Sequence, residues 1–324
     1  MIPSVALWAI LQSSHCLGFK NPQMNAPSDI PASAKTIIFA INPNSGASDK
    51  RALCDSIAAR LKSEGFEPIL LTDLDEVESL TKQHLASGTL RAVVSAGGDG
   101  TVSLLGNLLP AETPFAILPL GTENLLGRHL KLKADEDFFL SLIKQGKIRK
   151  IDASRANGKL FFVVASCGFD AAIVKRLDEV RSGHINYFSW LKPIAQTMFS
   201  YRFPPLRIWI DGKETPRPVR WAFIFNIPNY AINLRITPDA IDCDGKLDMC
   251  TYRDGGVLRG VWYLCVTLLG SHKRLDASSF AKFESMRIEA QCEEPVYYEL
   301  DGDPGGELPV EIEVVDQGLT VLVP

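Results

Sequence analysis

The sequence has no apolar stretch long enough to cross a bilayer. A membrane-spanning helix needs about 20 consecutive apolar residues. The run Val5–Leu11 is much shorter than that, and the longest candidate, Val257–Gly270, is interrupted by Arg259. We therefore expect no transmembrane segment.

The cysteines form neither pairs nor clusters. Their number is odd, no CxxC motif occurs, and the five histidines share no i, i+4 spacing. Secreted disulfide frameworks are usually even and dense, and zinc sites usually cluster their ligands. The pattern indicates free thiols in a reducing compartment, which here means the cytoplasm. The cysteines are Cys16, Cys54, Cys167, Cys243, Cys250, Cys265 and Cys292.

Positive charge is not in excess. Lys and Arg number 34 against 38 Asp and Glu, a formal charge of −4, which argues against a nucleic-acid partner because such proteins depend on a basic face. The 324 residues, 46% of them hydrophobic, suffice for a full core and for two domains at about 100–200 residues each.

Residues 1–34 do not have the pattern of a folded domain. Val5–Leu11 has the length of a signal-peptide core, but no Lys or Arg precedes it. The segment from Asn21 to Ala34 contains three prolines and is typical of a linker. A targeting segment, a disordered leader and a misplaced start all stay open.

The chain up to about residue 150 alternates strand and helix signals. This order predicts right-handed βαβ crossovers and a parallel sheet, with ligands at the carboxyl ends of the strands. Predicted strands are Thr36–Asn42, Glu67–Thr72, Arg91–Ser95 and Phe115–Leu118. Predicted helices begin near Ser48 or Asp49 and end before Gly65, then cover Glu76–Ala86, Val102–Leu109 and Asn124–Leu130.

After residue 150, short strand signals separated by turns take over, which predicts an antiparallel, β-rich domain. Expected strands are Leu160–Ala165, Leu206–Ile210, Trp221–Ile227, Lys246–Tyr252, Met286–Ala290, Val296–Leu300, Val310–Val315 and Leu319–Val323. Helices are expected near Ala171–Arg181, Tyr187–Tyr201 and Leu258–Leu269. The last two are rich in apolar and aromatic residues, typical of packed core but also of a lipid tunnel or a membrane-contacting face.

Three loops after predicted strands have the composition of phosphate-binding turns. Gly97–Thr101 reads GGDGT, Leu118–Asn124 reads LPLGTEN, and Asn42–Gly46 reads NPNSG. Glycines let backbone N–H groups approach an anion, and a following helix adds its positive N-terminus. Together the loops predict a nucleotide-triphosphate site that has neither a Walker A sequence nor a GxGxxG fingerprint. The alternative for GGDGT is a plain turn in which Asp99 caps its own helix at Thr101 or Val102.

In this order and spacing, the three loops resemble the diacylglycerol kinase catalytic domain family. That family includes bacterial soluble lipid kinases and sphingosine kinases, with the NAD kinases as distant relatives. The resemblance covers roughly residues 35–324. It continues in Cys167–Asp170 (CGFD), Ile236–Ala240 (ITPDA), Asp244–Asp248 (DGKLD) and Tyr298–Asp303 (YELDGD).

The resemblance implies an α/β ATP-binding domain over residues 35–150. It also implies an antiparallel β-sandwich over residues 151–324, whose last strand can return to the first domain. The implied reaction transfers the γ-phosphate of ATP, with Mg²⁺, to a hydroxyl of a diacylglycerol-like or sphingoid lipid at a membrane surface. Such catalysis is mostly positioning and charge stabilisation. Peripheral membrane contact is expected, and a homodimer is left open.

Carried over residue by residue, the resemblance assigns Asp99, Asp301 and Asp303 to catalysis, with Asp303 as the candidate general base. Asp99 would also bind Mg²⁺-ATP, and Asp248 would match a structural magnesium site. Nucleotide contacts would come from Asn42, Ser45, Gly46, Thr72, Gly97, Gly98, Gly100, Thr101, Gly121, Thr122 and Asn124.

Three departures from the family pattern bear on activity. Ser103 and Leu104 follow GGDGT where Asn and Glu are common, Leu125 replaces an acidic residue, and the last motif is DGD rather than DGE. Two alternatives therefore stand beside the lipid kinase. One is an NAD kinase-like enzyme, although the downstream TPTGS-type run is absent. The other is a non-catalytic relative that binds nucleotide or lipid. Arg128 could pair with a phosphate, with Asp99, or with solvent.

Overall fold

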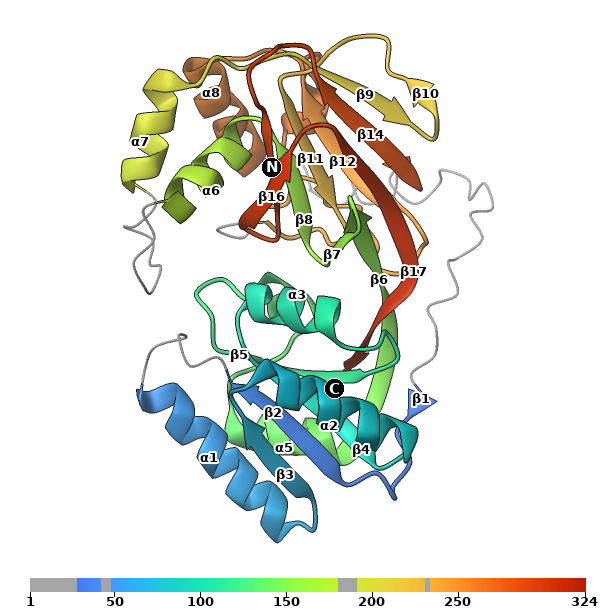
Figure 1. Cartoon of the computed structure of the whole chain (residues 1–324). Coiled ribbons are helices and arrows are strands. Elements are labelled where there is room, and N and C mark those ends of the chain that lie inside the picture. The colour runs from blue at the N-terminus through green and yellow to red at the C-terminus, as the bar shows by residue number, and fades with distance from the viewer. Residues whose placement is uncertain (1–27, 42–47, 180–190, 231–233) are drawn as a thin grey trace, which may run out of the picture.

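The computed structural model describes residues 28–41, 48–179, 191–230 and 234–324. These residues form two lobes, one above the other in Figure 1, and two long strands run along one side of both. Among the described residues no helix has the length and apolarity needed to traverse a bilayer.

The first lobe contains a parallel sheet in the order β3-β2-β4-β5. Its central strands are buried on both faces, so they read as continuous apolar runs. The strands are β2 (Thr36–Ile41), β3 (Glu67–Leu71), β4 (Leu90–Gly97) and β5 (Pro114–Pro119). The helices around them are α1 (Ser48–Ser63), α2 (Leu74–Ala86), α3 (Asp99–Leu108), α4 (Leu125–His129) and α5 (Glu136–Gln145).

The second lobe contains an antiparallel sheet in the order β13-β12-β11-β8-β15-β16. Three helices lie beside it, together at one side of the upper lobe in Figure 1. The strands are β8 (Val164–Cys167), β11 (Trp221–Phe225), β12 (Leu247–Tyr252), β13 (Ser278–Phe283), β15 (Tyr297–Leu300) and β16 (Asp303–Glu307). The helices are α6 (Phe169–Glu179), α7 (Leu191–Ser200) and α8 (Val257–Leu268), followed by the short 3₁₀ turn η3 (His272–Arg274).

Two long strands join the lobes. β6 (Lys147–Ala156) and β17 (Val310–Leu322) pair antiparallel along most of their length. At its far end β17 also pairs parallel with β5, through Thr320 and Val321. The C-terminal strand thereby extends the first lobe's sheet into one that also contains β1 (Ser28–Asp29), β7 (Lys159–Phe161), β9 (Leu206–Ile210), β10 (Lys213–Glu214) and β14 (Ser285–Ala290).

The fold class expected from the sequence is confirmed, and several elements differ in detail. The two expected strands Val310–Val315 and Leu319–Val323 form one strand, with an irregularity between Val315 and Leu319. The expected strand Leu160–Ala165 is divided between β7 and β8. Elements α5, β6, β13 and β16 were not predicted. The predicted helix Tyr187–Tyr201 begins outside the described residues, which contain its Leu191–Ser200 part.

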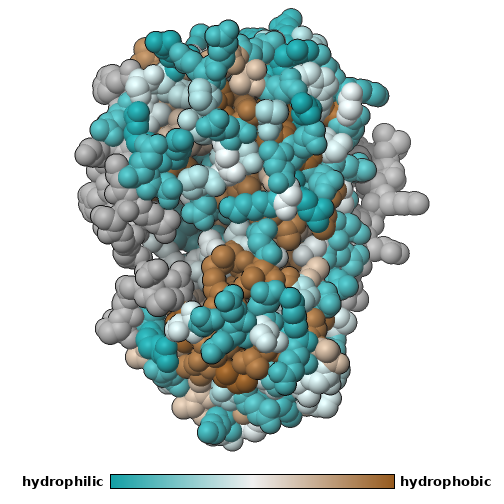
Figure 2. Space-filling model, in the orientation of Figure 1, coloured by the Kyte–Doolittle hydropathy of each residue, from teal (hydrophilic) through white to brown (hydrophobic). Residues whose placement is uncertain are grey.

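The surface in Figure 2 is mostly hydrophilic over the upper lobe. Hydrophobic residues gather over the lower lobe on this face, where α3 lies. Leu104 of α3 has 47% of its area exposed, so one of the residues that depart from the family pattern belongs to the surface rather than the core.

Candidate active site

The GGDGT and LPLGTEN loops touch each other through their backbones. The Leu120 N–H donates to the Gly97 carbonyl at 2.9 Å. A Cβ added to Gly121 would lie 2.5 Å from the Cα of Gly98, far closer than atoms in contact can approach. The two loops, which end neighbouring parallel strands, therefore meet at a distance that only glycine permits.

The Asp99 carboxylate joins the two loops, because it caps the helix that follows the second loop and not the helix that Asp99 itself begins. Its carboxylate accepts the Leu125 N–H at 2.7 Å and the Leu126 N–H at 3.1 Å, at the start of α4. The helix that Asp99 itself begins, α3, has Gly98 as its N-cap and no side-chain cap. The expectation that Asp99 caps at Thr101 or Val102 is therefore wrong, because its carboxylate is turned to the neighbouring loop. Burial raises the pKa of Asp99, and the two backbone N–H groups oppose that rise.

Asn124 closes the second loop on itself. Its Oδ1 accepts the Gly121 N–H at 2.8 Å, and its Nδ2 donates to the Gly121 carbonyl at 2.7 Å. Its φ of 51° lies in the left-handed region, which Asn tolerates better than most residues. Asn124 therefore shapes the loop, and the next two N–H groups face Asp99.

Asp301 is held by three consecutive backbone N–H groups of the second lobe. Its carboxylate accepts from Phe162 at 2.9 Å, Val163 at 2.9 Å and Val164 at 3.1 Å. Burial raises the pKa of Asp301 to about 7, the N–H groups oppose the rise, and the negative charge of Asp99 adds to it. The structure thus brings Asp99 and Asp301, more than 200 residues apart in sequence, into electrostatic contact.

Asp303 reaches the same place from β16. A Cβ added to Gly100 would lie 3.3 Å from Asp303 Oδ2, so this carboxylate lies against the first turn of α3. Helix α3 is in turn fixed to the second lobe, because Asn107 exchanges two hydrogen bonds with the backbone of Leu160, at 2.7 and 2.9 Å. The three predicted catalytic carboxylates therefore come together from both lobes.

Two further buried acids lie near this group. Both belong to segments that resemble the family, CGFD and YELDGD, but neither was assigned a role from the sequence. Glu299 is 1% exposed; its Oε2 accepts the Gly302 N–H at 2.8 Å, while Oε1 has no hydrogen-bond partner among the described residues. Burial raises the pKa values of Glu299 and Asp170, and each charge is unfavourable to the other. Asp170 accepts from Tyr230 Oη at 2.6 Å and Ser166 Oγ at 2.9 Å. The CGFD motif was the one sequence signal for Asp170.

An apolar cavity of about 270 Å³ opens beside Asp170. It lies between α6, α7, α8 and the strands β11 and β12, and aromatic and aliphatic side chains supply most of its wall. Asp170 and Tyr230 are among its few polar residues. The aromatic and aliphatic residues of the wall include Phe169, Ile173, Ile194, Met198, Trp221, Phe223, Tyr252 and Tyr263. Such a site fits an apolar molecule that has one hydrogen-bonding group.

The other predicted nucleotide contacts lie at or near the same edge of the sheet. Thr72 is exposed directly after β3, Thr122 is exposed in the second loop, and Thr101 packs against Gly97 in the first turn of α3. The predicted contacts in NPNSG (Asn42, Ser45 and Gly46) lie outside the described residues.

Asp248 does not join this site. It lies on β12, where Lys282 Nζ is 3.2 Å from its Oδ2 and also 2.8 Å from Asp244 Oδ2. Burial raises the pKa of Asp248, and the Lys282 ammonium opposes that rise. The partner observed for Asp248 is thus a lysine, and its role as a magnesium ligand stays a prediction.

The donors near the glycine loops suit a magnesium ion that arrives with its nucleotide. The described residues contain no group of three or more carboxylates, histidines or cysteines arranged around a common ion. Mg²⁺ usually binds through one or two carboxylates plus substrate phosphates, so a permanent protein cage is not needed. Asp99 and Asp303 are the carboxylates placed to serve.

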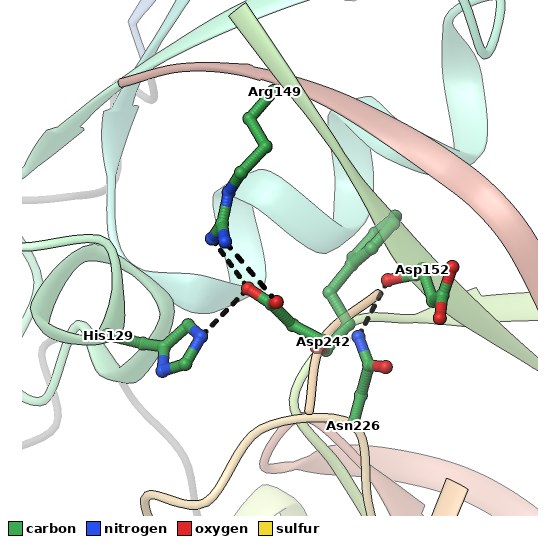
Figure 3. Close-up of polar contacts among 6 residues, drawn as sticks. His129, Arg149, Asp152, Asn226 and Asp242 are labelled. Atoms are coloured by element: carbon green, nitrogen blue, oxygen red, sulfur yellow. Dashed lines mark hydrogen bonds and ion pairs between the residues drawn. The ribbon is translucent and has the colours of Figure 1, made fainter. Parts of the chain in front are cut away.

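A separate charged cluster, shown in Figure 3, lies at the far end of α4. The Asp242 carboxylate is 2.9 Å from His129 Nε2 and 2.6 Å from Arg149 Nη2. Although burial raises the pKa of Asp242, its bonds to His129 and Arg149 outweigh that effect and hold the pKa below its ordinary value. Arg128, the preceding residue, pairs with Glu123 at 3.3 Å rather than with Asp99. The cluster links α4 to β6 at the lobe junction.

Comparison with known proteins agrees with this geometry. Residues 36–156 match the model of the diacylglycerol kinase catalytic domain, and residues 163–323 match that of the YegS C-terminal NAD kinase beta sandwich-like domain. Laid end to end, the two matches cover both lobes. The chain thus has a diacylglycerol kinase catalytic domain followed by a YegS-type C-terminal domain.

Its relatives include the diacylglycerol kinase of Staphylococcus aureus (strain MRSA252), 22% identical over 87% of this chain and 90% of that protein. The diacylglycerol kinase of Staphylococcus carnosus is 21% identical over 87% of this chain and 93% of its own. A putative diacylglycerol kinase from Bacillus anthracis has a similar fold, with a TM-score of 0.67 at 18% identity, covering 90% of this chain and 97% of that one. At the level of the family, these likenesses indicate a lipid kinase.

Proposed function

We propose that the protein is an ATP-dependent kinase that transfers the γ-phosphate to the hydroxyl of a lipid alcohol, diacylglycerol-like or sphingoid. One observation carries the proposal. Two glycine loops and three carboxylates come together from both lobes, and the buried acids Glu299 and Asp170 lie between them and an apolar cavity.

The glycine loops supply the phosphate-binding part of the mechanism. Gly97, Gly98 and Gly121 let the two loops pack closely at the carboxyl ends of β4 and β5, where backbone N–H groups and the N-terminus of α3 would receive the phosphates. Bound Mg²⁺-ATP would supply the phosphoryl group and neutralise charge that develops on it. Asp99 keeps both loops in register through α4, and its carboxylate would help to hold the ion.

Asp303 is the proposed base. As the lipid oxygen bonds to the γ-phosphorus and the bond to the ADP oxygen breaks, the hydroxyl proton passes to the Asp303 carboxylate. Asp301, two residues earlier, is locked by three N–H groups and fixes the turn that presents Asp303. Because the pKa of Asp301 is about 7, its charge changes near neutral pH and modulates the field at its neighbours.

The cavity supports a lipid acceptor over a dinucleotide. Its wall is mostly apolar, which suits an acyl or alkyl chain and offers little to ribose or nicotinamide. Asp170, held by Tyr230 and Ser166, can accept a hydrogen bond from a hydroxyl on an otherwise apolar molecule.

The test is transfer of radiolabelled γ-phosphate from ATP to a total lipid extract. The wild type is compared with Asp303→Asn, which keeps the side-chain shape and removes the base, and with Asp135→Ala, which removes the N-cap of α5. We expect a labelled lipid with wild type and Asp135→Ala and about 10²–10⁴-fold less with Asp303→Asn. ATP binding without a labelled lipid refutes the proposal, and labelling of added NAD instead identifies an NAD kinase-like enzyme.

A further inference from the structure

Helix α8 presents apolar side chains to solvent. Six large hydrophobic residues on or just after it are exposed: Leu258 by 86%, Val261 by 52%, Trp262 by 53%, Leu264 by 48%, Leu268 by 63% and Leu269 by 79%. We call these six the α8 ridge. Elsewhere in the described chain, only Leu74, Leu104 and Ile241 are comparably exposed, and they are dispersed over the fold.

The spacing makes the ridge a continuous stripe. Leu258, Val261, Trp262, Leu268 and Leu269 stand at i, i+3, i+4, i+10 and i+11, which lie on one face of an α-helix. The opposite face is occupied by Tyr263, Val266 and Thr267, which are buried. A helix that is apolar on both faces but has only one face packed needs a second apolar environment.

Charge within the ridge segment has one sign. From Val257 to Leu275 the sequence has no Asp or Glu, and it has Arg259, Lys273 and Arg274. All three basic residues are exposed, and Lys273 is ion-paired with Asp239, so Arg259 and Arg274 are the two without an acidic partner among the described residues. In a chain whose formal charge is −4, this is a local reversal of sign. Apolar side chains flanked by arginine and lysine are complementary to an anionic lipid surface.

The ridge is continuous with the apolar cavity. Val261 and Leu264 belong to both, since they line the cavity and are about half exposed. Gly260 and Tyr263, on the same helix, line the cavity from inside. A lipid that leaves a membrane under α8 can therefore enter the cavity without crossing a polar surface.

We propose that the α8 ridge is a membrane-docking surface that lies in the interface of an anionic bilayer and admits the lipid acceptor to the cavity. The role of the ridge as an entrance rests on the proposed kinase function. Binding to the bilayer follows from the ridge alone, so the two can be tested separately.

The binding test uses sedimentation with sucrose-loaded vesicles of phosphatidylcholine and phosphatidylglycerol at 7:3, and of phosphatidylcholine alone. The variant L258S/W262S/L269S removes three ridge side chains that do not line the cavity. Leu74→Ser, at an exposed leucine of the other lobe, is the matched control. We expect wild type and Leu74→Ser to partition onto anionic vesicles, more weakly onto neutral ones, and the triple variant to lose at least about tenfold.

The entrance is tested by comparing two forms of the acceptor. The triple variant should lose at least about tenfold in phosphorylation of a long-chain lipid alcohol in vesicles and keep its rate with a short-chain alcohol dispersed as monomers. If neither enzyme phosphorylates any lipid, the kinase proposal fails, while vesicle binding still decides the docking surface. Equal vesicle binding by wild type and triple variant overturns the docking surface. So does a wild-type dimer in sedimentation velocity that the triple variant lacks, because a second copy then covers the ridge.

Discussion

Replacement of Asp99 should separate a structural role from a chemical one. Its carboxylate accepts two N–H groups at the start of α4, so Asp99→Ala leaves two donors without an acceptor. Loss of an N-cap costs about 0.5–2 kcal/mol, and hydrogen bonds to a charged group are worth about 1.5–3 kcal/mol. Burial raises the pKa of Asp99, which means that its charged form has a desolvation cost. Removal of the carboxylate relieves that cost and offsets part of the lost free energy of unfolding. We expect a net loss of about 1–2 kcal/mol.

Asp99→Asn sharpens the result. Its single carbonyl oxygen can accept one of the two N–H groups, so the free energy of unfolding should lie between those of wild type and Asp99→Ala. Phosphoryl transfer should nevertheless be lost in both variants, because both lack the carboxylate that we propose binds Mg²⁺-ATP.

The control is Asp135→Ala. Asp135 caps α5 by accepting the Phe138 N–H at 2.8 Å, and the next two residues, Glu136 and Asp137, pair with Arg60 in the last turn of α1, away from the glycine loops. Urea unfolding should show a loss of about 0.5–2 kcal/mol with unchanged kinase activity. The reasoning is refuted if Asp99→Ala unfolds at the same urea concentration as wild type, or if Asp99→Asn keeps full activity.

Three further perturbations have defined outcomes. Gly121→Ala places a Cβ 2.5 Å from Gly98 Cα and should weaken ATP binding at least about tenfold by calorimetry. Gly212→Ala controls for backbone strain alone, because its φ of 77° disfavours alanine but no atom lies within 4 Å, and it should leave ATP binding unchanged. The pKa of Asp301 is higher in the folded state than in the unfolded chain, so the folded state binds more protons between about pH 4 and 7. The free energy of unfolding should therefore fall as pH rises through that window, by at most about 4 kcal/mol. Asp301→Asn should flatten this slope in urea titrations. Asp242→Ala leaves its partners Arg149 and His129 (Figure 3) without a carboxylate and should cost about 3 kcal/mol in urea unfolding, and a loss below 1 kcal/mol would contradict the cluster's role at the lobe junction.

The parallel half of the fold could be predicted because its local signals agree with its burial. Ile57 and Leu61 share one face of α1 and are fully buried, as their spacing predicts. Strand β2 is an uninterrupted apolar run because both of its faces are covered.

The elements that were not predicted differ in their signals. Helix α5 has the local signals of a helix, an Asp135 cap at its start and a left-handed Gly146 at its end, so it could have been predicted. Strand β6 mixes Lys and Arg with apolar residues because only part of it is buried. Gly318 and Gln317 interrupt the pattern of β17, although the strand continues on both sides of them. Pairing with β6 stabilises β17 although the local β-strand propensity is low at these two residues.

The site could be predicted in part. The resemblance to the family led to the three aspartates predicted to be catalytic, and the structure brings them together. It could not predict that Asp99 would cap a helix of the next loop, because that bond joins residues 26 positions apart. Glu299 belongs to the YELDGD segment, but nothing in that segment marks this glutamate as buried.

The paired strands β6 and β17 belong to both lobes, so the two lobes should fold as one unit. A cut after Ala156 would separate β5 from β17, the strand that pairs with its edge, and removal of the last dozen residues would expose the same edge of β5 in the first lobe. Gene fragments that encode either lobe alone should therefore yield aggregating chains. Any movement of one lobe relative to the other must twist the two paired strands, and a pair of strands is stiffer than a single-chain linker. A circular permutant with new ends in a surface turn, such as that between β9 and β10, would preserve the paired strands intact.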